Sequence, residues 1–258
     1  EAIYKDFKKS TFDTYATELA LIYHDIKYAK RNIYKWSKLK RVGTNLLNFP
    51  AKSYILPEPL GVCLVIGAWN YPYQLTLSPV VAAIAAGNTV VIKPSELAVN
   101  TSAVMAKLIN ENFDSKYLKV VEGGVSETTV LLENKFDKIF FTGSPQVGKI
   151  VYQAAAKNLT PVTLELGGKS PVVVFNDAEQ ENALNGITAG IFGASGQSCI
   201  AGSRLYIQSD IYDDFLNKLV AKAEKIKLGA PMNKDTQMGP LNSIKQLKDI
   251  EKNIKATI

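Results

Sequence analysis

The sequence predicts an α/β fold built on a parallel β-sheet, and three observations lead to this prediction. Short apolar runs alternate with helical segments from residue 61 onward, which is the pattern of βαβ units. The first run, GVCLVIG at 61–67, lacks the apolar–polar alternation of a half-exposed strand, as expected of a strand that is covered on both faces. Hydrophobic residues make up 47% of the 258 residues, which is enough to form a sizeable core.

The first predicted element is a helix over residues 12–36, in which apolar side chains recur at steps of three and four. Lys and Arg residues without any acid fill the stretch 27–41. We interpret this stretch as a solvated helix face. Nucleic-acid binding would need aromatic side chains interleaved on the same face and a larger overall charge than +6, so no nucleic-acid partner is expected.

The alternating part follows, with strands at 61–67, 89–93, 118–121 and 138–141 and helices at 74–86, 101–110, 126–132 and 147–157. Right-handed crossovers place the ends of these strands at one edge of the sheet, where ligands bind in open parallel sheets. After residue 166 the pattern starts again, with strands at 171–175 and 204–207 and helices at 178–189 and 211–227. Two glycines at 167 and 168 are a plausible hinge between two lobes.

Composition excludes several classes of protein. Two cysteines are too few for a disulfide scaffold, and the single histidine, His24, argues against a Cys/His zinc cluster and a Ser-His-Asp triad. No metal site is therefore expected. The longest apolar stretch, residues 80–86, is far shorter than the roughly 20 residues of a membrane-spanning helix. Because no signal-peptide pattern opens the chain and the cysteines look unpaired, a cytoplasmic location is expected.

One segment resembles a nucleotide-triphosphate loop: the run 143–149, GSPQVGK, follows a predicted strand and opens a predicted helix. The next residue of such a loop is Ser or Thr, whose hydroxyl binds Mg²⁺, but here it is Ile150. Pro145 also lacks a backbone N–H that would hold phosphate. An NTPase is therefore disfavoured. The remaining interpretation is a helix N-terminus that offers free N–H groups to a phosphate or pyrophosphate.

Cys199 is a candidate nucleophile because it lies among small and polar residues, in GQSCIAG. Cys63, inside the apolar run GVCLVIG, is interpreted instead as an ordinary core residue. A carboxylate is the natural partner for Cys199, since His24 is remote in sequence and on a helix. Glu165 ends an apolar run, where partial removal from water would suit a general base. The alternative is a Glu that pairs with Lys169 or caps a loop.

Asn70 is the third candidate, because it follows the first strand of the alternating part, in GAWNYP. A side-chain amide at the ligand edge of a parallel sheet can donate a hydrogen bond to a developing oxyanion. An Asn two residues before a proline is more often a turn residue, so this role depends on what surrounds it.

Five motifs together resemble the aldehyde dehydrogenase superfamily, and they occur in the family's order: PLGVCLVIGAWNYP (59–72), AAGNTVVIKPSE (85–96), FTGSPQVGK (141–149), LELGGKSP (164–171) and GQSC (196–199). Residues 12–190 are most similar to the class 3 branch, whereas the sequence after residue 195 is more similar to the general NAD-dependent branch. The resemblance implies a Rossmann-like cofactor domain with N-terminal helices over 1–166. It also implies the first part of an α/β catalytic domain over 167–258.

The resemblance implies a role for each site residue. Cys199 would be the nucleophile, Glu165 the general base, and Asn70 an oxyanion donor together with the backbone N–H of Cys199. The other residues would bind the cofactor. Lys93 and Glu96 would hold the adenosine ribose, Ser144 the pyrophosphate, and Val147 would lie beside the adenine. Gly143 and Gly167 would let the backbone approach the cofactor, and Trp69 would belong to the same site.

The implied reaction is NAD(P)-dependent oxidation of an aldehyde to a carboxylic acid, through a thiohemiacetal and a thioester on Cys199, with Glu165 activating water. Glu96 favours NAD, while the nearby Lys93 leaves NADP open. Because family members are nearly twice as long, the chain is expected to be incomplete, and a non-catalytic or truncated fragment of the same fold is the alternative. The full-length form is expected to act on a small-molecule aldehyde as a homodimer or homotetramer.

Overall fold

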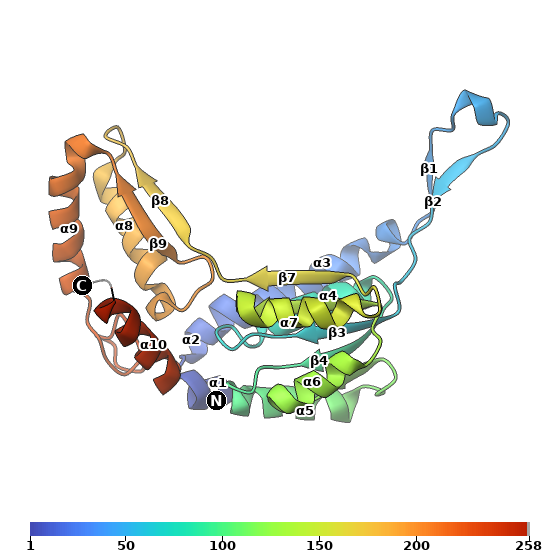
Figure 1. The fold of residues 1–258 in the computed structure, drawn as a ribbon, viewed down its shortest axis with the longest axis horizontal. Coiled ribbons are helices and arrows are strands. Elements are labelled where there is room, and N and C mark those ends of the chain that lie inside the picture. The colour runs from blue at the N-terminus through green and yellow to red at the C-terminus, as the bar shows by residue number, and fades with distance from the viewer. Residues whose placement is uncertain (257–258) are drawn as a thin grey trace. The chain divides into compact units, whose positions relative to one another are not determined.

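The computed structural model describes residues 1–256 (Figure 1). The chain divides into two compact units. The large unit comprises Phe12–Glu165, and the small unit comprises Glu1–Thr11 together with Leu166–Ile258. The boundary falls inside the last strand of the large unit's sheet, β7 (Val162–Leu166).

A five-stranded sheet with the order β5-β4-β3-β6-β7 forms the centre of the large unit. Its central strand β3 pairs in parallel with β4 and with β6, and β4 pairs in parallel with β5. The predicted parallel sheet is therefore confirmed, and the carboxyl ends of these four strands lie along one edge. The strands are β3 (Val62–Ile66), β4 (Thr89–Lys93), β5 (Leu118–Val120) and β6 (Lys138–Gly143).

Three helices pack on this sheet: α4 (Gln74–Ala85), α5 (Val99–Asn112) and α7 (Pro145–Ala156). A fourth helix, α6 (Val125–Glu133), contacts α7. One hydrophobic cluster joins alternate residues of β3, β4 and β5 to Val80 of α4 and to Met105 of α5. Helix α7 contacts β6 and buries Val151 completely. All four residues 63–66 are at most 6% exposed, because both faces of β3 are covered, as the absence of alternation predicts.

The predicted N-terminal helix is confirmed as α2 (Thr11–Thr14), a π-helical turn over Tyr15–Leu19 and α3 (Ala20–Trp36). Most of its apolar stripe is nevertheless exposed, and α3 fully buries only Ile22. The basic residues of 27–41 are all exposed, which fits a solvated face. An antiparallel hairpin that the sequence does not predict, β1 (Lys40–Val42) and β2 (Ser53–Ile55), projects from the large unit (Figure 1).

The small unit is built on a parallel pair of strands, β8 (Ser170–Val174) and β9 (Gly202–Ile207), which confirms the restart of the pattern after residue 166. Phe215, which is completely buried, forms the core of this unit with Val174, Leu184 and Ile187. Its helices are α8 (Gln180–Phe192), α9 (Tyr212–Glu224), and two that the sequence does not predict, α1 (Ala2–Phe7) and α10 (Ile244–Lys255). None of the helices in the described residues is long and apolar enough to cross a membrane.

Candidate active site

The loops that follow β3, β4, β5 and β6 lie at the carboxyl edge of the large unit's sheet, because these strands run parallel. Ligands bind at this edge in open parallel sheets. The strand ends, loops and helix starts at this edge carry Asn70, Lys93 to Glu96, Gly123 to Glu127, and Gly143 to Val147. The topology therefore brings every cofactor-binding candidate of the large unit to the same edge.

Lys93, the last residue of β4, places a buried ammonium group at this edge. Its side chain is only 2% exposed, and its Nζ donates a hydrogen bond of 2.6 Å to the carbonyl oxygen of Pro94. The same Nζ lies 3.8 Å from Oε2 of Glu96, whose side chain is half-exposed. Burial lowers the pKa of Lys93, and the negative charges of Glu96 and Glu127 oppose that shift. The structure thus places the two predicted ribose-binding residues side by side.

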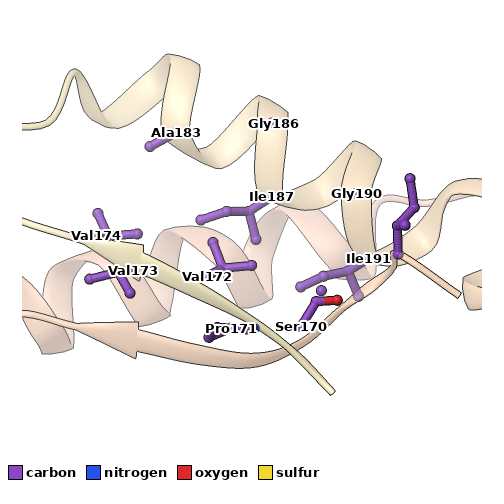
Figure 2. Close-up of a pocket in the computed structure, with 12 residues that line it drawn as sticks. Ser170, Pro171, Val172, Val173, Val174, Ala183, Gly186, Ile187, Gly190 and Ile191 are labelled. Carbon is purple, nitrogen blue, oxygen red and sulfur yellow. The ribbon is translucent and has the colours of Figure 1, made fainter. Parts of the chain in front are cut away.

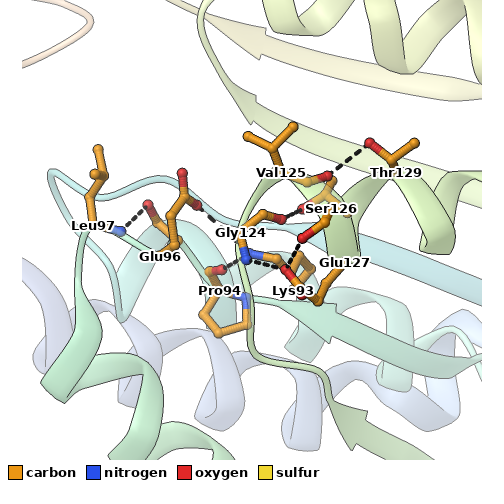
Figure 3. Close-up of polar contacts among 11 residues, drawn as sticks. Lys93, Pro94, Glu96, Leu97, Gly124, Val125, Ser126, Glu127 and Thr129 are labelled. Carbon is orange, nitrogen blue, oxygen red and sulfur yellow. Dashed lines mark hydrogen bonds and ion pairs between the residues drawn. The ribbon is translucent and has the colours of Figure 1, made fainter.

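Glu127 joins this cluster and is absent from the sequence-based candidates. Its carboxylate folds back over the start of α6, where it accepts hydrogen bonds of 2.6 Å from the backbone N–H of Gly124 and 2.9 Å from the hydroxyl of Ser126 (Figure 3). The hydrogen bond from its own backbone N–H lowers the pKa of Glu127 most, followed by the bonds from Ser126 and Gly124 and, to a lesser degree, by the charge of Lys93. A capping signal was present in the sequence, since a glycine at the N-cap is followed three residues later by Glu.

The start of α7 is exposed and capped. Ser144 is its N-cap, and the Ser144 hydroxyl accepts a hydrogen bond of 3.3 Å from the backbone N–H of Val147, while Pro145 occupies the first helical turn. The resemblance implies that glycine at position 143 lets the backbone approach a cofactor. The structure gives a second reason for glycine at this position. A Cβ at position 143 would lie 2.6 Å from Cζ of Phe141, so the strand's own packing already requires glycine there.

Asn70 and Trp69 are half-buried in the loop between β3 and α4. The far end of this loop is fixed by Glu18, a completely buried carboxylate on the π-helical turn. Its Oε2 accepts hydrogen bonds from the backbone N–H groups of Tyr73, at 2.7 Å, and Gln74, at 3.3 Å. A carboxylate at a helix N-terminus is favourable, because it satisfies free N–H groups and complements the helix dipole.

Glu165, near the end of β7, is exposed. The prediction that this carboxylate is partly removed from water is wrong for the chain described here. The reason is its position on β7, one of the two edge strands of the sheet, where fewer neighbours cover a side chain. A Cβ at the nearby Gly167 would have no atom within 4 Å, so packing does not require glycine at that position.

The two cysteines differ as the sequence predicts. Cys63 is buried in the hydrophobic cluster of the large unit, and this burial raises the pKa of its thiol. Cys199 is exposed, in the small unit, between a short helical turn and β9. The backbone just before Cys199 is strained, because Ala194 and Ser195 have φ values of 49° and 56°, which side chains with a Cβ rarely adopt. Such strain persists only where the surrounding structure enforces it.

Two hydrogen bonds hold this loop in place. The hydroxyl of Ser195 donates to the carbonyl oxygen of Gly239 at 2.9 Å, and the backbone N–H of Asn242 donates to Oε1 of Gln197 at 2.8 Å. The glycine pair also contacts the loop, since a Cβ on Gly168 would lie 3.6 Å from the carbonyl oxygen of Cys199. The thiol therefore sits on an anchored turn that the 239–242 segment supports.

A pocket of about 350 Å³ lies between β8 and α8 in the small unit (Figure 2). Its walls are mostly hydrocarbon, from Val172, Ile187 and Ile191 among others, and Ser170 contributes a hydroxyl. Ile200, which follows Cys199 in the chain, also lines it. The pocket offers apolar surface and no charged side chain to a ligand.

The structure thus brings Lys93 and Glu96 together with Glu127, and places Ser144 and Val147 at one helix start. Asn70 and Glu165 belong to the large unit and Cys199 to the small unit. Their convergence on one reacting carbon stays a prediction.

Comparison with known proteins gives a consistent result. The chain matches the Aldehyde dehydrogenase family over residues 8–258. The 4,4'-diaponeurosporen-aldehyde dehydrogenase of Staphylococcus aureus is 48% identical over 219 residues, which are 85% of this chain and 48% of that protein. Aldehyde dehydrogenase family 3 member A2 of Pongo abelii is 45% identical over 218 residues, 84% of this chain and 45% of the relative.

A solved structure agrees with these relatives. Betaine aldehyde dehydrogenase from Staphylococcus aureus in complex with NAD+ matches with a TM-score of 0.85 and 32% identity, over 98% of this chain and 50% of that one. The chain spans about half the length of the curated relatives it matches. The parallel sheet, the motifs along its carboxyl edge and the match over residues 8–258 lead to one conclusion: the chain belongs to the aldehyde dehydrogenase family.

Proposed function

We propose that this protein oxidises an aldehyde to the carboxylic acid and uses NAD as the electron acceptor. Family membership supports aldehyde oxidation in general. The observation that carries the proposal is the exposed thiol of Cys199 on a strained and anchored loop. A thiol outside the core and held by a fixed turn suits a nucleophile better than a packing residue.

The residues at the carboxyl edge fit NAD. The ammonium group of Lys93 has three N–H donors and gives one to Pro94, so donors are available for a ribose hydroxyl. The half-exposed carboxylate of Glu96 can accept a hydrogen bond from such a hydroxyl. The capped start of α7 presents a helix N-terminus, which favours a pyrophosphate. The NAD+ complex of the betaine aldehyde dehydrogenase supports the same cofactor for this family member.

In the proposed reaction the thiolate of Cys199 adds to the aldehyde carbon, and the new C–S bond leaves negative charge on the oxygen. Asn70 and the backbone N–H of Cys199 donate hydrogen bonds to that oxygen; one such donor typically contributes about 3 kcal/mol to lowering the barrier. NAD bound at the carboxyl edge would supply the hydride acceptor, and loss of hydride from the carbon would leave a thioester on the sulfur of Cys199. Glu165 takes a proton from water as the water attacks the thioester, the C–S bond breaks and the acid departs.

The test is aldehyde-dependent formation of NADH by the wild-type chain and by the variants Cys199→Ser and Cys63→Ala. We expect Cys199→Ser to lose the activity and Cys63→Ala, whose thiol is buried, to keep it. Intact mass after incubation with aldehyde and NAD should show an acyl adduct on the wild type but not on Cys199→Ser. A wild-type chain that binds NAD yet yields neither NADH nor adduct would be a non-catalytic form of the fold, and the proposal would be wrong.

A further inference from the structure

The cluster around Lys93 contains one more negative charge than a single lysine can balance. Lys93 is buried and interacts with the charges of both Glu96 and Glu127. The interaction with Glu127 is mutual, since the charge of Lys93 in turn helps to lower the pKa of Glu127. One cation and two carboxylates therefore meet at the edge of the sheet where the adenosine ribose is proposed to bind (Figure 3).

The structural role of Glu127 needs a hydrogen-bond acceptor, and its negative charge adds a favourable interaction with the start of α6. Glu127 is the third residue of α6, and its side chain caps the helix by accepting a hydrogen bond from the N–H of Gly124. Gln serves this capping position as well as Glu, because an amide oxygen accepts the same bond. A change of Glu127 to Gln therefore keeps the acceptor of the cap and removes the charge.

The position of this charge is fixed by the backbone before it. Gly123 has a φ of +129°, and a Cβ there would lie 2.3 Å from Cγ of Glu127. Only glycine allows the Glu127 side chain to fold back to the N–H of Gly124 and the hydroxyl of Ser126. The carboxylate is thus held at one place by the backbone and by two hydrogen bonds.

Lys93 does not supply a free cation to a ligand phosphate. It is the largest completely buried side chain of the chain's described part, and its ammonium already bonds to Pro94 and faces Glu96. NADP differs from NAD by a 2′-phosphate on the adenosine ribose, which adds a charge of about −2 near neutral pH. A phosphate at this position would meet two carboxylates and a single ammonium group, which already bonds to Pro94 and faces Glu96.

We propose that Glu127 is a specificity-determining residue that, together with Glu96, disfavours a 2′-phosphate on the adenosine ribose and makes the protein prefer NAD to NADP. The proposal rests on the proposed function, since it assumes that an adenine dinucleotide binds at this edge. Glu127 acts through its fixed charge and through Lys93 and takes no part in the chemistry at Cys199.

The test measures binding by calorimetry, without aldehyde, so that it does not depend on catalysis. NAD and NADP are titrated into the wild-type chain, Glu127→Gln and the matched control Glu133→Gln, which removes an exposed charge from the other end of α6. AMP and adenosine 2′,5′-bisphosphate repeat the comparison with the ribose end alone. We expect the NADP-to-NAD ratio of Kd to fall about tenfold in Glu127→Gln, the scale of one unit charge close to a surface site. NAD affinity should change less than about twofold, and Glu133→Gln should match the wild type.

Two further comparisons separate charge from structure. Glu127→Asp keeps the charge and should keep the ratio, and added salt should reduce the ratio in the wild type more than in Glu127→Gln. An unchanged ratio in Glu127→Gln would overturn the inference, as would equal weakening of NAD and NADP or a fall of the ratio in Glu127→Asp as well. A wild-type chain that binds no NAD would overturn the proposed function together with this inference, whereas NAD binding with an unchanged ratio overturns the inference alone.

Discussion

Replacing Gly67 with Ala tests how tightly the loop that carries Asn70 is packed. Gly67 follows β3, and a Cβ at this position would lie 1.9 Å from Oγ1 and 2.9 Å from Cβ of Thr76. Thr76 is completely buried on α4 and has little room to withdraw. Overpacking of this kind costs about 1–3 kcal/mol. The lower entropy of an unfolded Ala returns about 0.4–1 kcal/mol. We therefore expect Gly67→Ala to lower the free energy of unfolding by about 1–2 kcal/mol.

Urea unfolding followed by tryptophan fluorescence is the assay, because both tryptophans, Trp36 and Trp69, belong to the large unit and report on it. The matched control is Gly43→Ala in the same unit, where a Cβ meets nothing within 4 Å. We expect that control to be as stable as the wild type or slightly more stable.

A double-mutant cycle identifies the contact. Thr76→Ala removes both side-chain branches of Thr76. Its hydroxyl has no hydrogen-bond partner among the residues that the structure describes, so its loss breaks no bond there. The double variant Gly67→Ala/Thr76→Ala should recover at least 0.5 kcal/mol relative to the sum of the single variants, as for residues in direct contact. If Gly67→Ala unfolds at the same urea concentration as the wild type, or if the two effects simply add, the close approach does not limit this loop.

The remaining predictions concern the site. Glu165→Gln should still form the acyl adduct on Cys199, seen by intact mass, but its steady-state NADH formation should fall about 10²–10⁴-fold, the range for loss of a general base; an unchanged rate would remove Glu165 from that role. Ser144→Ala should lose about 1 kcal/mol of stability with the cap of α7. Ser144→Asp should restore the cap yet weaken NAD binding, because its charge repels the pyrophosphate, and tighter NAD binding by this variant would contradict the assignment. The pKa of Glu127 lies below its usual 4.5 in the folded state. Its contribution to stability is therefore complete above that pH and is lost as pH falls through the lower folded value, so wild type and Glu127→Gln should converge in thermal midpoint under acid.

Much of the fold follows from local patterns in the sequence. Four consecutive apolar residues at 63–66 predict a strand buried on both faces, because only such a strand can place every side chain in a core. The hairpin β1–β2 escapes prediction, since its strands are three residues long and exposed, and so carry no alternation. The exposure of Glu165 escapes as well, because it depends on which strands lie at the edges of the sheet.

The residues of the candidate site also divide into those that the local sequence identifies and those that it does not. An open, small-residue setting singles out Cys199 as exposed before any coordinates are known. Glu127 is not found, since Lys93 lies 34 residues away and their interaction depends on where the fold places the start of α6 relative to the end of β4. The reason for glycine at 143 is likewise a matter of packing, because it depends on the ring of Phe141 on the same strand.

The contrast between the two thiols has a practical consequence. Burial hides the sulfur of Cys63 and keeps it protonated, whereas that of Cys199 faces solvent. An alkylating reagent added at equal molarity should therefore modify one position per molecule and leave the core intact. Such a reagent would count competent molecules in a preparation, and a fluorescent version would attach a reporter at the turn before β9 without any engineered cysteine.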